Sequence, residues 1–317
     1  MKLRIAFYLS LLMQASAALA ADPAPTSRVF RDAPQIAQAE MAPVLAASNA
    51  GKRVVAVGDY GIVILSDDGK TFRQAKTVPT RSVLTSVFFI DDQHGWAVGH
   101  DGTVIASSDG GENWQVLHEE FGKERALLSV WFENAQHGFA VGQFGLVLET
   151  ADGGKTWSER RLLEGESGDK HLLQIFPAGG GLVLIAAEAG SMLRSADGGK
   201  TWQMVQTDNK GSFWTGIALA DGTLLAAGMR GHVYRSTDRG LSWKEVPSGT
   251  LQSLTSVVQK QDGSVRLVGL SGTVLSSKDQ GQSFSGNTLA SRTNLTSIAN
   301  GPAGELLFSL AGLVKEK

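Results

Sequence analysis

The sequence has 317 residues, of which 42% are hydrophobic and 19% charged, so it can build a large folded core. The formal net charge of −2 gives no overall attraction to nucleic acid, and the absence of cysteine excludes disulfides and a lipid anchor on a signal-peptide cysteine. Glycine is abundant (38 residues) and proline scarce (8 residues), which favours many tight turns over a disordered linker.

Residues 1–20 have the pattern of a secretory signal peptide. Lys2 and Arg4 precede a short apolar stretch, and Ala18-Leu19-Ala20 fits the small-residue cleavage pattern. The apolar stretch is too short to anchor the chain in a membrane, and no later stretch reaches 18 apolar residues. We therefore expect cleavage after Ala20, export to a bacterial periplasm and no direct membrane insertion of the mature protein. A short isolated strand is predicted next, at residues 27–31.

An octapeptide of the form S/T-x-D-x-G-x-[TSN]-[WF] then recurs along the chain. Ungapped copies lie at 107–114, 150–157, 195–202, 236–243 and 277–284, and a copy one residue shorter lies at 66–72. Each copy has one aspartate and a closing aromatic residue: Asp68, Asp109, Asp152, Asp197, Asp238 and Asp279, with Phe72, Trp114, Trp157, Trp202, Trp243 and Phe284. The aspartate can accept backbone N–H groups across a turn, the glycine permits positive φ, and the aromatic ring can pack between neighbouring repeats. We interpret the octapeptide as structural.

The "GGKT" within two of these copies does not indicate a phosphate-binding loop. That motif requires a further glycine five residues before the GK pair, at position 149 or 194. Glu149 and Arg194 occupy those positions, so the phosphate-loop interpretation is rejected.

The residues between the copies repeat as well. Each copy follows a predicted hairpin such as "GWAVGHDGTVIAS", with two apolar runs around a two-residue turn, and each hairpin follows a short strand such as "LTSVFF". A fourth strand is expected to start at the closing aromatic residue. Four short strands in each period of 41–45 residues are typical of a β-propeller blade.

The blade count predicts an all-β, seven-bladed propeller of four-stranded antiparallel blades. Six octapeptides define six blades, and strands near 295–299 and 305–314 begin a seventh that ends without a fourth strand. We expect the strand at 27–31 to complete this last blade, because closure removes an exposed strand edge. Residues 21–317 would then form a single domain, which we expect to be a monomer.

One face of this propeller carries the candidate binding residues. The hairpin tips and the loops leading into each inner strand should share a face around the mouth of the central channel. The predicted tips are Asp59-Tyr60, His100-Asp101, Gln143-Phe144, Glu188-Ala189, Met229-Arg230, Leu270-Ser271 and Leu310-Ala311. Basic residues recur just ahead of the inner strands, namely Arg81, Arg125, Lys170, Lys210 and Arg292, and Arg230 is predicted at a hairpin tip. Arginine is suited to bidentate recognition of carboxylate or phosphate. We predict Arg81, Arg125, Lys170, Arg230 and Arg292 as a partner-binding rim.

The sequence offers little support for catalysis or metal binding. His94 and His137 lie in matching "QHG" turns, and the other four histidines show no ligand spacing. Neither a nucleophile elbow nor a His-based triad stands out. We predict no catalytic residue, no metal site and no cofactor.

The octapeptide resembles the Asp box, or BNR repeat, of sialidases and related propellers. Together with the "LTSV" strands, the passages "HGWAVGHDGTVIASSDGGENW" (94–114) and "HGFAVGQFGLVLETADGGKTW" (137–157) resemble the photosystem II assembly/stability factor family and its relatives in non-photosynthetic bacteria. The resemblance covers most of the mature chain. It implies a non-enzymatic propeller that docks on a membrane-protein complex or an assembly intermediate. An arginine patch is implicated in that family, with Arg81, Arg125 and Arg292 as the analogous candidates, and its non-photosynthetic relatives are associated with RND-type exporters.

Two alternatives remain open. A sialidase-like glycoside hydrolase needs an arginine cluster, a tyrosine nucleophile and an acid, which Arg81, Arg125, Arg292, Tyr60 and Asp101 could supply. However, the N-terminal "FRDAP" (30–34) departs from the F-R-I-P-type motif of those enzymes, and sialidase propellers usually have six blades. A propeller that binds glycans or peptides without a membrane partner is the second alternative.

Overall fold

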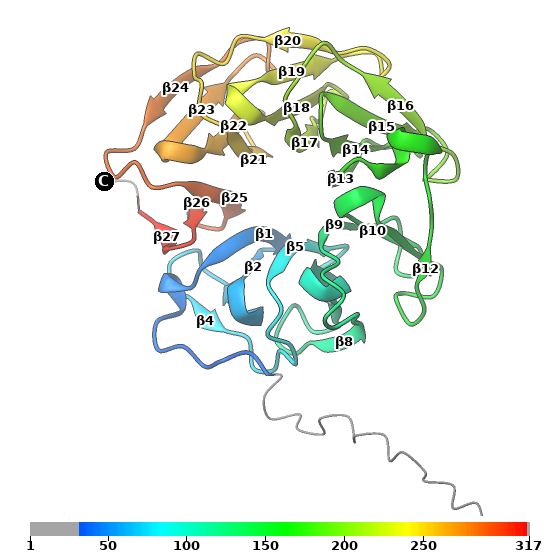
Figure 1. Ribbon diagram of the computed structural model, residues 1–317. Coiled ribbons are helices and arrows are strands. Elements are labelled where there is room, and N and C mark those ends of the chain that lie inside the picture. Colours follow the sequence, from blue (N-terminus) through cyan, green and yellow to red (C-terminus); the bar gives the residue numbers. More distant parts are fainter. Residues whose placement is uncertain (1–31, 316–317) are drawn as a thin grey trace, which may run out of the picture. The chain divides into compact units, whose positions relative to one another are not determined.

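The computed structural model describes residues 32–315. These residues form seven antiparallel sheets arranged as blades around a centre (Figure 1). Six sheets have four strands, and the described residues give the seventh three. In each sheet the strand order follows the chain, from an inner strand to an outer one. The predicted seven-bladed β-propeller is therefore confirmed.

Each blade contributes one strand at each distance from the centre. The inner strands are β1 (Val44–Ala50), β5 (Leu84–Phe89), β9 (Leu127–Phe132), β13 (Leu172–Pro177), β17 (Phe213–Ala218), β21 (Leu254–Gln259) and β25 (Leu295–Gly301). The second strands are β2 (Arg53–Gly58), β6 (Gly95–Gly99), β10 (Gly138–Gly142), β14 (Val183–Ala187), β18 (Leu224–Gly228), β22 (Val265–Gly269) and β26 (Gly304–Ser309).

The third strands are β3 (Val63–Ser66), β7 (Val104–Ser107), β11 (Val147–Thr150), β15 (Ser191–Ser195), β19 (Val233–Ser236), β23 (Thr273–Ser277) and β27 (Gly312–Val314). The outer strands are β4 (Arg73–Gln74), β8 (Gln115–His118), β12 (Ser158–Glu159), β16 (Gln203–Gln206), β20 (Lys244–Val246) and β24 (Ser285–Thr288). The helical elements are short 3-10 turns: η2 (Ala39–Met41), η3 (Asp59–Gly61), η4 (His100–Gly102), η5 (Gln143–Gly145), η6 (Gly165–Asp169), η7 (Met229–Gly231) and η8 (Leu270–Gly272). Among residues 32–315, no helix has the length and apolar character needed to cross a membrane.

The hydrophobic core lies between the blades. Second strands such as β6 and β10 are buried along their whole length, because each faces a neighbouring blade on both sides. The buried clusters accordingly combine side chains from adjacent blades, as where Val55 and Leu65 of blade 1 meet Ala97 and Ile105 of blade 2. Each blade therefore depends on its neighbours for burial.

The octapeptides form the turns between third and outer strands, as predicted. In the copy at 150–157, Asp152 accepts the Thr156 N–H (2.9 Å) and hydroxyl (2.6 Å) as well as the Thr150 hydroxyl (2.9 Å). The Thr150 hydroxyl oxygen in turn accepts the N–H of Gly154 (2.9 Å). Gly154 has φ 92°, and a Cβ there would lie 2.7 Å from Leu117 of the preceding blade. This glycine is therefore needed both for its conformation and for the close approach of the blades.

The closing aromatic residues pack between neighbouring blades, as predicted. Trp114 is 4% exposed and lies in the cluster between blades 1 and 2, with its ring edge-to-face on Phe89 at 6.0 Å. Its Nε1 donates to the Gly111 carbonyl (2.8 Å), so the indole belongs to the turn. The outer strand consequently starts one residue later than predicted, at Gln115.

The "LTS" residues of the inner strands join neighbouring blades, a role that the sequence did not reveal. The Thr85 hydroxyl donates to the Leu127 carbonyl of the next blade (2.6 Å), and Thr255 does the same to Leu295 (2.8 Å). Thr296 donates to Val44 (2.7 Å), which links blade 7 to blade 1. These bonds hold the inner strands together around the centre.

The predicted closing strand at 27–31 lies outside the described residues. The described part of the N-terminal segment begins beside blade 1, where the Ala33 N–H donates to Val78 (2.9 Å) and the Ile36 N–H donates to Gln74 of β4 (3.0 Å). It then reaches blade 7, since a Cβ at Gly312 would lie 2.2 Å from the Glu40 carbonyl. The segment thus contacts both sides of the junction where the first and last blades meet.

Candidate functional site

The propeller presents two chemically different faces. One face, the tip face, is made of the turns between second and third strands (the tips) and the loops that lead from each outer strand to the next inner strand. The two parts are in contact: the tip glycines Gly102 and Gly145 donate their N–H groups to the Arg125 and Lys170 carbonyls (2.7 and 2.9 Å). The other face, the Asp-box face, carries the octapeptides, as where Gly153 N–H donates to Gln136 (2.8 Å). This arrangement agrees with the predicted division of the faces.

Six tips share one unusual backbone conformation. The predicted two-residue turns are present, but their central residues lie one position later than expected, as in Tyr60–Gly61. Both central residues have positive φ, 55° and 69° in this tip. The first central residue is not glycine in any of these six tips, and its φ lies between 52° and 56°: Tyr60, Asp101, Phe144, Ala189, Arg230 and Ser271. The chain therefore places six different side chains in equivalent left-handed positions on one face.

The predicted basic residues all lie on the tip face, each beside or within a tip. Arg81 lies next to the tip of blade 1 and Arg292 next to that of blade 6, since a Cβ on Gly61 or Gly272 would lie 3.4 or 3.0 Å from the respective Cα. Arg230 is itself a tip residue of blade 5. Lys170 follows η6 beside the tip of blade 3. The structure thus distributes these cations around the face, on different blades.

The predicted basic residues differ in whether their side chains are already bound within the protein or free to contact a partner. Arg125 pairs with Glu120 (3.0 Å) and Glu159 (2.8 Å), so its charge is already neutralised. The Arg81 Nε donates to the Asp32 carbonyl (2.8 Å). Arg230 and Arg292 are exposed, and neither guanidinium has a partner among residues 32–315. The sequence could not separate these cases, because one of the acids that bind Arg125 lies in its own loop and the other, Glu159, in strand β12, 34 residues away.

Exposed apolar side chains gather on the tip face. Phe144 (72% exposed) and Tyr60 (58%) are tip residues, while Phe121 (75%) and Leu251 (84%) lie in the adjoining loops. Leu310, at the tip of blade 7, is also exposed. Such a concentration on one face is typical of a protein-binding surface.

The charged residues of the tip face are unevenly distributed among the blades. In blades 5 to 7, the tips and loops at 229–232, 247–253, 270–272, 289–294 and 310–311 carry two charged residues, Arg230 and Arg292. The tips and following loops of blades 2 and 3 instead carry both signs of charge, with the acids Asp101, Glu119, Glu120, Glu124, Glu164, Glu166 and Asp169 and the bases Lys123, Arg125, Arg160, Arg161 and Lys170. The face is therefore not the uniformly basic rim that the sequence pattern suggested: blades 5 to 7 form a sparsely charged, cationic sector, and blades 2 and 3 form a sector of mixed charge with exposed aromatic rings.

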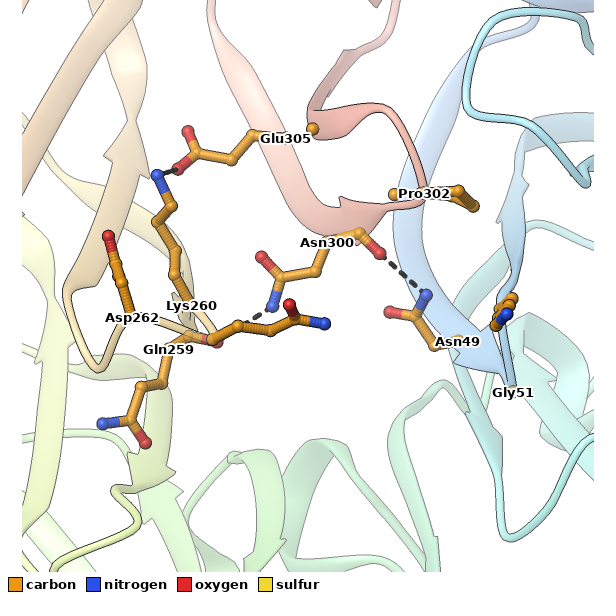
Figure 2. A pocket seen from close by; sticks show the side chains of 12 residues that line it. Asn49, Gly51, Gln259, Lys260, Asp262, Asn300, Pro302 and Glu305 are labelled. Carbon is orange, nitrogen blue, oxygen red and sulfur yellow. Dashed lines mark hydrogen bonds and ion pairs between the residues drawn. The ribbon is translucent and has the colours of Figure 1, made fainter.

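A hollow lies on the Asp-box face, where blades 6, 7 and 1 meet (Figure 2). It measures about 820 Å³ and is lined by Asn49, Gln259, Asn300 and their neighbours. Its polar groups are mostly engaged: Asn49 Nδ2 donates to the Asn300 carbonyl (2.9 Å), and Asn300 Nδ2 donates to the Gln259 carbonyl (2.9 Å). Lys260 pairs with Glu305 (3.1 Å). These contacts fasten three blades together, which leaves few groups in the hollow for a ligand.

The other candidate groups serve local structure. His137 lies between Glu133 (3.0 Å) and Glu149 (2.9 Å); its partial burial disfavours protonation, but both carboxylates favour it, and the pKa of His137 is raised above its ordinary value. Within residues 32–315, no group of three or more His, Cys, Asp or Glu side chains is arranged to hold a metal ion. For a hydrolase, Tyr60 and Asp101 lie on the tips of different blades, and Arg125 is occupied by acids.

Comparison with known proteins identifies related sequences and folds. Residues 65–124 and 117–266 match the family described as "Photosynthesis system II assembly factor YCF48". None of the curated proteins matches the sequence significantly.

Several solved structures share the fold. YCF48 bound to a D1 peptide is 23% identical over 72% of this chain and 76% of its own, with a TM-score of 0.58. YCF48 from Cyanidioschyzon merolae is 16% identical over 89% of this chain and 97% of its own, with a TM-score of 0.66. The GH74 enzyme of Niastella koreensis is 15% identical over 87% of this chain and 52% of its own, with a TM-score of 0.66. Identities this low show the propeller fold alone.

Proposed function

Because the chain belongs to the photosynthesis system II assembly factor YCF48 family, we propose that it is a non-catalytic scaffold that binds a polypeptide segment of a partner through its tip face. The Asp boxes on the opposite face stabilise the turns of the blades. The hydrogen bonds of the inner strands join neighbouring blades. The tip face instead carries unpaired cations and exposed apolar side chains. These are the groups that a protein partner would contact.

One observation carries the proposal. A YCF48 structure that aligns with 72% of this chain was solved with a bound D1 peptide. Because a protein of the same fold and family binds a peptide, peptide binding is the first function to test for this protein. The partner that we propose is a membrane-protein complex or its assembly intermediate, of which an RND-type exporter is one candidate. The signal-peptide pattern of residues 1–20 supports a periplasmic location for this encounter.

The test is cross-linking and capture of tagged protein from intact cells, with identification of the captured membrane proteins. The informative variant is Arg230→Ser with Arg292→Ser, because neither guanidinium supports a described contact. Arg239→Ser with Lys278→Ser is the matched control, since both residues are exposed on the Asp-box face and the charge change is equal. Both variants should unfold near the wild-type temperature, because exposed charges contribute little to stability.

We expect the wild type and the control to capture the same membrane protein and the tip-face variant to lose it. Equal capture by both variants would place the interface elsewhere. Failure of all three proteins to capture a partner, together with turnover of a fluorogenic glycoside by the wild type, would favour the glycoside hydrolase alternative.

A further inference from the structure

The tips of blades 1 to 3 combine features that the repeat does not require. Tyr60, Asp101 and Phe144 occupy the same left-handed position in three consecutive blades. Glycine, asparagine and aspartate tolerate this conformation best, and two of these three residues are bulky aromatics. The chain uses 38 glycines but places none at this position of the six tips. A residue that is kept where its backbone is disfavoured points to a role for its side chain.

Asp101 lies at the centre of this group. Its Oδ1 accepts the Gly122 N–H at 3.3 Å and its Oδ2 accepts the Ser82 hydroxyl at 3.4 Å, both long bonds from neutral donors. No cation lies within ion-pair distance of this carboxylate among residues 32–315. In contrast, the nearby Glu120 pairs with Arg125 (3.0 Å) and Lys123 (3.6 Å). Asp101 is therefore a carboxylate without a counter-charge in the part of the chain that the structure describes.

Exposed aromatic rings accompany this carboxylate. Phe121, 75% exposed, sits between two residues that hold Asp101, since the Glu120 N–H donates to the Asp101 carbonyl (2.7 Å) and the Gly122 N–H donates to its side chain. Phe144 and Tyr60 stand on the tips of the two flanking blades, 72% and 58% exposed. Phe144 is held in place by the His171 ring, 4.5 Å away. An unpaired carboxylate beside an exposed aromatic ring, with further exposed rings on the two flanking blades, is suited to recognise an organic cation.

We propose that Asp101, with Phe121, Phe144 and Tyr60, forms a subsite for a lysine or arginine side chain of the bound polypeptide. The inference rests on the proposed function, because it specifies what the partner segment must carry. The proposed subsite also gives the two sectors of the tip face different roles in binding the partner segment. Blades 1 to 3 bind a cationic side chain, and Arg230 and Arg292 of blades 5 to 7 face the acidic or carboxylate groups of the same segment. A partner with separated charges would then bind in one direction only.

The test uses a random-peptide library displayed on phage and selected against the full mature protein. Each selected peptide that contains lysine is resynthesised with norleucine in its place, which keeps the length of the side chain and removes the charge. We expect lysine or arginine to be enriched at one position and the norleucine peptide to bind about tenfold more weakly. Asp101→Asn should abolish the difference between the two peptides, and Phe144→Ser should reduce it.

Matched controls come from the opposite face. Asp92→Asn removes an exposed carboxylate and Leu241→Ser an exposed apolar side chain of the Asp-box face, and both should preserve the lysine preference. Selection of peptides that bind equally well with norleucine would overturn this inference and leave the scaffold function standing. An Asp101→Asn protein that still prefers lysine would overturn it as well. If the wild type selects no peptide at all, the proposed function itself fails.

Discussion

Trp114 and Trp157 occupy equivalent places in adjacent blades but differ in one hydrogen bond. A comparison of the two sites therefore measures what this hydrogen bond contributes to the free energy of unfolding. Each ring packs edge-to-face, at 6.0 Å, on a phenylalanine of its own inner strand, Phe89 or Phe132. Trp114 Nε1 donates to the Gly111 carbonyl at 2.8 Å. Trp157 Nε1 is shielded from solvent and has no acceptor. Replacement of each tryptophan by phenylalanine therefore removes similar packing but different polar contacts.

The expected difference in stability between the two variants follows from the free energy of a buried N–H group with and without a hydrogen-bond acceptor. Trp114→Phe loses a hydrogen bond worth about 1 kcal/mol as well as packing. Trp157→Phe loses packing but also removes a buried, unsatisfied N–H, which relieves about 1–3 kcal/mol. We expect Trp114→Phe to be the less stable variant by about 2–4 kcal/mol, or about 3–7 °C in unfolding temperature for a domain of this size. The natural phenylalanines at positions 72 and 284 show that the fold accepts this ring.

The assay is guanidinium unfolding followed by far-UV circular dichroism, because fluorescence would change with the tryptophan itself. The two variants should differ in midpoint but share one denaturant slope with the wild type. Equal destabilisation of the two variants, or a greater loss in Trp157→Phe, would refute the reasoning that the Gly111 bond and the unsatisfied Nε1 determine the outcome.

Three further predictions concern the ring, the octapeptides and the tips. Thr296→Val removes the bond to the Val44 carbonyl at the junction of the last and first blades and should cost about 1–2 kcal/mol by denaturant unfolding; an unchanged midpoint would contradict it. Hydrogen bonds from Thr156 lower the pKa of Asp152 to about 2, and those from Ser277 and Ser283 lower that of Asp279 to about 2. Because both folded values lie below the unfolded value of about 3.9, this stabilisation is complete above pH ~4 and should be lost as the pH falls towards ~2, seen as a falling unfolding temperature. Tyr60→Gly should raise stability slightly, since relief of about 1–2 kcal/mol of left-handed strain exceeds the ~0.5–1 kcal/mol entropic cost of glycine; a lower unfolding temperature would show that Tyr60 packs usefully.

The fold could be predicted from sequence because its determinants are local and repeated. An aspartate, a glycine and an aromatic residue within eight positions specify a turn, and six copies at a nearly constant spacing specify blades. The hairpins could also be predicted from the sequence, although the predicted turn centres lie one residue before the observed ones. That error arose because the leading glycines, such as Gly58, look like turn residues. Gly58 is instead in extended backbone, and a Cβ there would lie 1.8 Å from the Pro43 carbonyl.

The contacts between blades could not be predicted in the same way. Thr85 and Leu127 are bonded across 42 residues, and only the assembled ring brings them together. The same limit applied to the candidate site. The recurrence of basic residues before the inner strands placed them on one face, as observed, but the pairing of Arg125 with Glu159 of β12 and the unpaired state of Asp101 depend on segments far apart in the sequence. Periodicity reveals the side chains that every blade needs, whereas a binding site is built from those that differ.

This difference explains why the tip face can change without loss of the ring. Each Asp box and inter-blade threonine contributes to a blade junction, so a substitution there weakens the whole ring. A tip residue contacts few neighbours, and its backbone is fixed by the glycine that follows it and by the bond from Gly102 or its equivalent to the adjoining loop. The backbone therefore keeps one geometry while the side chain varies from tyrosine to aspartate to arginine. Each non-glycine tip residue introduces local backbone strain. In return, the tips present a rigid set of dissimilar side chains whose spacing is set by the blades.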